Sequence, residues 1–105
     1  MTQTPHTPKR NQKLLKSKAD FNREDLAAFL ENLATRIRAG DMTLGTGEGA
    51  VSMELSGTFR TTMEVTDSHR RRGIERELEL EIEWLVDDTG APVDEDGQAS
   101  GFAVS

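Results

Sequence analysis

Apolar and charged side chains alternate along residues 74–84, read IERELELEIEW. The side chains of a β-strand alternate between two faces, so this stretch has one apolar face and one acidic face if it is extended. Glutamate and leucine favour helices, but a helix would leave much of the same apolar surface in water. The pattern therefore predicts a strand over residues 74–85, with the only tryptophan, Trp84, at the end of the core.

A second pattern predicts a helix over residues 22–39, because apolar residues recur there at intervals of three and four. The stripe consists of Leu26, Phe29, Leu30, Leu33 and Ile37. Asn22 suits the N-cap, and Gly40 suits the left-handed conformation that ends many helices. The stripe indicates a helix that packs on a sheet.

Alternation elsewhere predicts the remaining strands. They are residues 13–21, then a hairpin of residues 42–44 and 50–55, then residues 58–66, which a polar connection over 67–73 joins to the strand at 74–85. Strands joined by short turns pair antiparallel. The expected fold is α+β, with one helix packed on a four- or five-stranded, mostly antiparallel sheet in the order β-α-β-β-β-β.

The apolar phase of each element defines a predicted core. Its members are Leu15, Leu26, Phe29, Leu30, Leu33, Ile37, Leu44, Val51, Met53, Leu55, Phe59, Met63, Val65, Leu78, Leu80, Ile82 and Trp84. One helix covers only part of a sheet this wide, and Arg76, in phase with the apolar row, marks where the cover ends. We expect the remaining apolar surface to be buried by a second copy or a protein partner.

Composition sets the outer limits of this picture. The chain has 105 residues, no cysteine and a formal net charge of −6. We expect one domain over residues 13–86, a disordered tail at 1–12 and an acidic flexible tail at 87–105. The lack of cysteine and of an apolar leader favours the cytoplasm. The acidity disfavours nucleic acid, and no apolar run is long enough for a membrane.

Three motifs could carry chemistry, and each has a simpler interpretation. The string at Asp88-Thr89-Gly90-Ala91 copies the active site of retroviral-type aspartic proteases, but the chain lacks the strands which that fold needs after it. The glycine-rich stretch 45–49 leads into a strand rather than a helix, which favours a turn over a phosphate site. A flat glutamate ladder does not converge on a cation. We expect no catalytic, cofactor-binding or metal-binding residues, and no enzyme.

Two charged groups are candidates for binding a partner. They are the glutamates Glu77, Glu79, Glu81 and Glu83, and the arginines Arg70, Arg71 and Arg72 in the polar connection. The expected function is a non-catalytic interaction or assembly module that binds a protein or forms a homodimer. The alternative is a nucleic-acid-binding accessory domain that uses the arginines and the basic residues from Lys9 to Lys18.

The ladder Glu77-Leu78-Glu79-Leu80-Glu81-Ile82-Glu83-Trp84 resembles the amphi-Trp domain family, short prokaryotic domains named for an amphipathic strand that ends in a tryptophan. The helix at 23–37 and the short hairpin after Gly40 fit as well, so the resemblance covers residues 13–85. The chain departs from the usual form in its longer section at 58–73 and its two tails. The resemblance implies no established activity and no catalytic residues.

Overall fold

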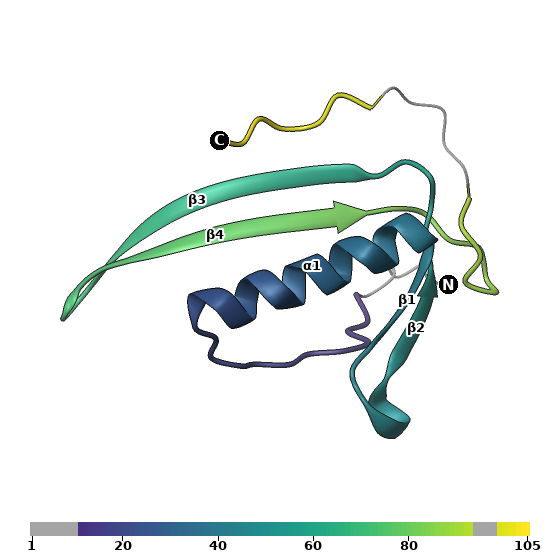
Figure 1. The fold of residues 1–105 in the computed structure, drawn as a ribbon, viewed down its shortest axis with the longest axis horizontal. Coiled ribbons are helices and arrows are strands. Elements are labelled where there is room, and N and C mark those ends of the chain that lie inside the picture. The colour runs from purple at the N-terminus through teal and green to yellow at the C-terminus, as the bar shows by residue number, and fades with distance from the viewer. Residues whose placement is uncertain (1–10, 94–98) are drawn as a thin grey trace, which may run out of the picture.

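The computed structural model describes residues 11–93 and 99–105. Helix α1 (Arg23–Ala39) is followed by β1 (Asp41–Leu44), the short 3₁₀ helix η1 (Gly47–Gly49), β2 (Val51–Glu54), β3 (Arg60–Arg70) and β4 (Gly73–Glu83) (Figure 1). The fold is α+β, as predicted. Most of the predicted N-terminal tail and residues 94–98 of the predicted C-terminal tail lie outside the described residues. In the part that is described, no helix is long and apolar enough to cross a membrane.

Both ends of α1 are fixed by the residues that the sequence indicates. The side-chain oxygen of Asn22 accepts a hydrogen bond of 2.7 Å from the Asp25 N–H, so Asn22 is the N-cap. Gly40 has a φ of 92°, and its N–H donates to the carbonyl oxygens of Arg36 and Ile37. This left-handed residue ends the helix and turns the chain directly into β1.

A change of Gly40 to alanine is expected to lower the free energy of unfolding by about 1–2 kcal/mol, because a Cβ disfavours the left-handed conformation. Gly49→Ala is the matched control, since Gly49 does not have a positive φ and no atom lies within 4 Å of the added Cβ. Urea unfolding followed by circular dichroism measures both. Equal losses for the two variants would contradict this assignment of the helix end.

The strands form two separate antiparallel sheets of two strands each, β1 with β2 and β3 with β4. The prediction of one sheet with four or five strands is therefore wrong. Each strand pairs only with its neighbour in sequence, which closes the shortest loops. The β1–β2 hairpin has four residues a strand against eleven in the β3–β4 hairpin, so it could cover only part of the longer edge.

Residues 13–21, predicted as a first strand, are irregular in the structure. Side chains rather than a backbone ladder hold this segment in place. Leu15 is half-buried, and the ring of Phe21 packs on Phe29 of α1 with centroids 5.8 Å apart. The apolar pattern that suggested a strand thus identifies two residues that attach an irregular segment to the rest of the chain.

The polar connection predicted over 67–73 is mostly strand. β3 continues to Arg70, and only Arg71 and Arg72 form the turn before β4. Cross-strand charge pairs stabilise this polar extension: Asp67 faces Arg76, and Arg70 reaches Glu75. The sequence of residues 67–73 suggested a loop because the residues that pair across this part of the hairpin are charged rather than apolar.

Burial is the largest difference from the predicted core. Among the described residues only Met42 is a buried hydrophobic residue, at 7% exposure, and it was not among the predicted core members. Nine predicted core residues are half-buried: Leu15, Leu33, Ile37, Leu44, Val51, Met53, Leu55, Phe59 and Trp84. The other eight are exposed: Leu26, Phe29, Leu30, Met63, Val65, Leu78, Leu80 and Ile82. The pattern identified the apolar faces, but eight of these described residues remain 38% to 68% exposed.

Candidate interaction surface

The β3–β4 hairpin separates apolar from charged side chains almost completely. Residues directly opposite in an antiparallel pair point to the same face. One face, called here the apolar face, carries the pairs Met63 with Leu80, Val65 with Leu78 and Thr61 with Ile82. The other, called the acidic face, carries Glu64, Glu75, Glu77, Glu79, Glu81 and Glu83. The alternation predicted from the sequence is therefore confirmed as a strand with two unlike faces.

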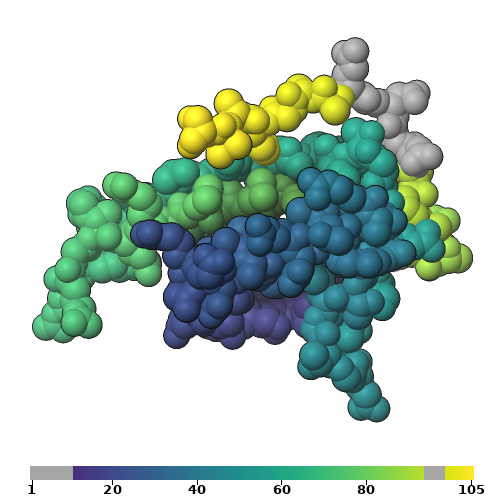
Figure 2. Space-filling view, viewed as in Figure 1, coloured from purple at the N-terminus to yellow at the C-terminus, as the bar shows by residue number. Residues whose placement is uncertain are grey.

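The apolar face is open to solvent along the outer part of the hairpin. Val65 is 65% exposed and its partner Leu78 is 68% exposed. Figure 1 shows the hairpin running well past the end of α1, and Figure 2 shows its tip projecting from the body of the molecule. A two-stranded ribbon with one uncovered apolar face is marginally stable in water by itself. This surface is therefore the strongest candidate for a binding site.

An ion pair interrupts the apolar face near the tip. Arg76 donates two hydrogen bonds to the carboxylate of Asp67, from Nε at 2.7 Å and from Nη2 at 2.9 Å. Hydrogen bonding to Arg76 lowers the pKa of Asp67 below its ordinary value. The sequence predicted that the cover ends at Arg76, but it ends earlier, because Leu78 is already 68% exposed. Ile74, 57% exposed, continues the apolar row beyond Arg76. The facing carboxylate neutralises the charge of Arg76.

The Asp67–Arg76 pair is expected to stabilise the hairpin at neutral pH and not in strong acid. Because the pKa of Asp67 is lowered in the folded state, its contribution is present above the ordinary aspartate pKa of about 4 and is lost as the pH falls through the lowered value. Urea unfolding of the wild type and Asp67→Asn should show a small difference at neutral pH. A difference that persists at about pH 2 would contradict the assignment.

The acidic face has cations only at its ends. Arg60 reaches Glu83 at 3.4 Å, and Arg70 reaches Glu75 at 3.1 Å. Between them Glu64 lies directly opposite Glu79. Like charges in direct opposition are unfavourable, so the middle of this face must remain hydrated or meet a cationic partner.

The predicted partner-binding residues do not form one site. Glu77, Glu79, Glu81 and Glu83 share the acidic face, whereas Arg71 and Arg72 form the turn at the far end of the hairpin. Arg70 is joined to Glu75, so part of the positive charge at the tip is neutralised within the hairpin. The Asp67–Arg76 pair was missed, although the two residues are equally far from the turn.

The base of the apolar face opens into an apolar cavity of about 400 Å³. α1, both hairpins and Trp84 contribute to its wall, which includes Leu33, Ile37, Met42, Phe59, Ile82 and Trp84. Trp84 meets Phe59 edge-to-face, with ring centroids 5.5 Å apart and an angle of 89°. Its indole N–H is buried without a hydrogen-bond partner among the described residues. Trp84 closes the core as predicted, but the core is only partly filled.

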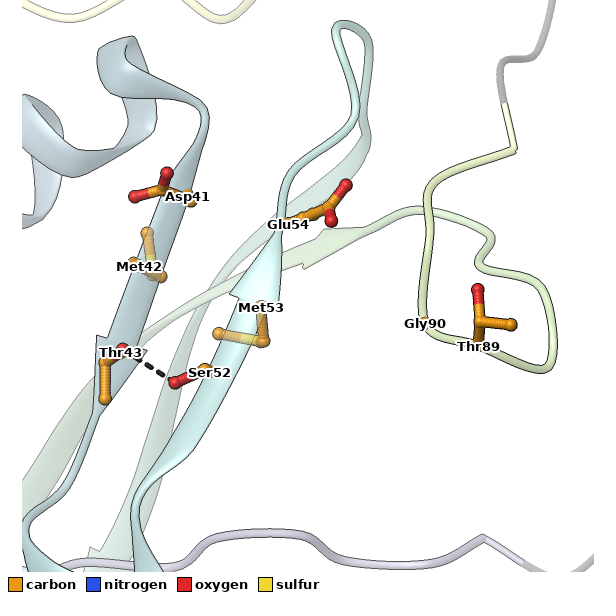
Figure 3. Close-up of a pocket in the computed structure, with 8 residues that line it drawn as sticks. All are labelled: Asp41, Met42, Thr43, Ser52, Met53, Glu54, Thr89 and Gly90. Atoms are coloured by element: carbon orange, nitrogen blue, oxygen red, sulfur yellow. Dashed lines mark hydrogen bonds between the residues drawn. The ribbon is translucent and has the colours of Figure 1, made fainter.

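A shallower pocket of about 340 Å³ lies between the β1–β2 hairpin and the loop at Thr89 (Figure 3). Two carboxylates, Asp41 and Glu54, lie on its rim, and Arg36 of α1 forms an ion pair with Asp41. The hydroxyls of Thr43 and Ser52 share a hydrogen bond of 2.8 Å across the hairpin. Its eight lining residues include no histidine and bring no base to either hydroxyl.

The protease-like string forms a small closed loop. Asp87, not Asp88, is its centre: the carboxylate accepts hydrogen bonds from the Thr89 hydroxyl at 2.7 Å and from the N–H groups of Thr89 and Ala91. These bonds, the hydroxyl first, lower the pKa of Asp87. A bridge between Val86 and Pro92 closes the loop. The carboxylate therefore stabilises a turn.

No group of three or more histidine, aspartate or glutamate side chains in residues 11–93 and 99–105 is arranged to hold a metal ion. On a flat ribbon, neighbouring residues of one face are about 7 Å apart along a strand. This spacing is too wide for direct ligands to one cation.

Comparison with known proteins supports the features just described. The profile of the Amphi-Trp domain matches residues 8–105. The chain belongs to the Amphi-Trp domain family. The match covers nearly the whole chain and extends beyond residues 13–85, whose pattern suggested the resemblance. No curated protein and no solved structure matches this Amphi-Trp chain.

Proposed function

We propose that this Amphi-Trp domain is a non-catalytic interaction module that binds a protein surface through the apolar face of its β3–β4 hairpin. The observation that carries the proposal is the exposure of Val65 and Leu78, which face each other in the middle of that ribbon. Large exposed apolar patches on small domains mark sites of protein interaction. The acidic face on the other side keeps the ribbon soluble and sets its orientation.

Two further observations favour a protein partner. Arg70, near the tip, forms an ion pair with Glu75. This pair reduces the positive charge that would be available to bind phosphate groups of a nucleic acid. The carboxylates of Asp67 and Asp87 are likewise held by groups of their own hairpin and loop. A module of this kind needs no catalytic group, and its lack of cysteine suits a reducing compartment such as the cytoplasm.

Affinity capture from the native host tests the proposal with a matched pair of variants. Val65→Glu and Thr66→Glu add the same charge at neighbouring positions but on opposite faces of β3. We expect proteins bound to the wild type to be kept by Thr66→Glu and lost with Val65→Glu. If both variants retain the same proteins, the apolar face is not the binding surface.

A further inference from the structure

We infer that the partner that covers the apolar face is a second copy of this chain, in a two-fold dimer. This inference rests on the proposed function and names the partner. Each copy would place the apolar face of its β3–β4 hairpin against the hairpin and the first half of α1 of the other copy. Three observations support it: the area left exposed, the presence of a second exposed apolar surface, and the distribution of charge.

The exposed area is sufficient for a stable dimer. The chain exposes 9767 Å², whereas a folded monomer of 11.6 kDa exposes about 5,800 Å². Even if residues 1–10 and 94–98 exposed the maximum for an extended chain, about 2,400 Å², roughly 1,600 Å² of excess would belong to the described residues. A standard interface buries about 800 Å² per partner, and a permanent dimer buries more.

The first half of α1 and Phe21, which precedes the helix, carry a second exposed apolar surface. Phe21, Leu26, Phe29 and Leu30 are each between 43% and 49% exposed. In Figure 1 this end of the helix points toward the tip of the hairpin, whereas the other end borders the cavity at the base. An interface in which the hairpin of each copy meets the helix of the other covers both surfaces with one contact, as two-fold symmetry requires.

The distribution of charge favours a second copy of this chain over a charged ligand. The central pairs of the apolar face, Met63 with Leu80 and Val65 with Leu78, carry no charge, and Asp67 and Arg76 beside them neutralise each other. A basic or acidic ligand would therefore find no countercharge there. In the dimer both acidic faces would remain in water, where salt screens their repulsion. Added salt should consequently tighten the dimer.

Sedimentation equilibrium of the purified full chain tests the inference. We expect the wild type to dimerise and the dissociation constant to fall when sodium chloride is raised. Val65→Glu should raise the dissociation constant at least a hundredfold, whereas Thr66→Glu, with the same added charge on the acidic face, should change it less than threefold. If Val65→Glu does not fold, Val65→Thr, of nearly the same shape, should still raise the constant severalfold.

A wild type that remains monomeric at millimolar concentration would overturn the inference, and so would a dimer that Val65→Glu and Val65→Thr leave unchanged. Neither result overturns the proposed function, because the affinity capture would still show whether an unlike protein binds the apolar face. Conversely, a dimer that depends on Val65 establishes the second copy even if no other protein is captured.

Discussion

Trp84→Ala is expected to lower the free energy of unfolding by about 3 kcal/mol, the largest effect of any single truncation in this chain. The side chain joins three elements, because it meets Phe59 edge-to-face and borders the cavity that α1 and both hairpins enclose. Its removal would enlarge a cavity that is already about 400 Å³. Since the variant has no tryptophan, urea unfolding should be followed by far-ultraviolet circular dichroism.

Trp84→Phe is the control for this result. A phenyl ring keeps most of the apolar contact with Phe59 and removes an indole N–H that is buried without a partner among the described residues. The expected loss is about 1 kcal/mol, as for other large-to-smaller changes that retain packing. Equal losses for the alanine and phenylalanine variants would show that the ring does not anchor the base of the hairpins.

Met42→Ala is expected to lower the free energy of unfolding by about 2–3 kcal/mol. Met42 is 7% exposed and borders both the apolar cavity and the shallower pocket beside the β1–β2 hairpin. Met63→Ala removes the same side chain from a position that is 46% exposed, and in dilute monomer it should change stability by about 0.5 kcal/mol or less. Urea unfolding at micromolar concentration compares the two.

At high protein concentration, the same two variants, Met42→Ala and Met63→Ala, also test the dimer. If a second copy covers the apolar face, Met63 becomes buried in the dimer, and Met63→Ala should then be costly while the effect of Met42→Ala stays the same. A Met63→Ala effect that does not depend on concentration would place this residue outside any interface.

Local structure was largely predictable from the sequence because it depends on local chemistry. The alternation ending at Trp84 predicted β4, and Asn22 and Gly40 predicted both ends of α1. The β1–β2 hairpin was predicted for the same reason. The spacing of apolar residues and the capping of a helix depend only on residues that are close in sequence, so both can be predicted from one sequence.

The prediction of secondary structure failed where the same pattern of apolar and polar residues fits more than one local structure. Residues 13–21 have an apolar phase but lie unpaired, anchored by Leu15 and Phe21. Asp67 reads as loop, yet it belongs to β3 because Arg76 lies opposite. Cross-strand partners depend on register, which a polar stretch specifies only after the turn is known.

The candidate surface was predictable in its composition and not in its exposure. Alternation identified Val65, Leu78 and Leu80 as apolar-face residues, and the width of the sheet suggested that some of this surface would be left over. Which part is covered depends on how α1 and the two hairpins meet, and no local pattern records that. The end of the apolar row nearest Trp84 borders the cavity at the base, whereas Leu80, Leu78 and Val65 are 57% to 68% exposed.

The unfolding midpoint of the wild type as a function of protein concentration tests the central claim most directly. A dimer that covers the apolar face stabilises the folded chain by mass action, so the thermal midpoint should rise steadily between about 1 µM and 1 mM. The midpoint of Val65→Glu should stay constant over the same range. A wild-type midpoint that does not move across this thousandfold range would contradict the account, because the outer half of the ribbon would then be stable without a cover.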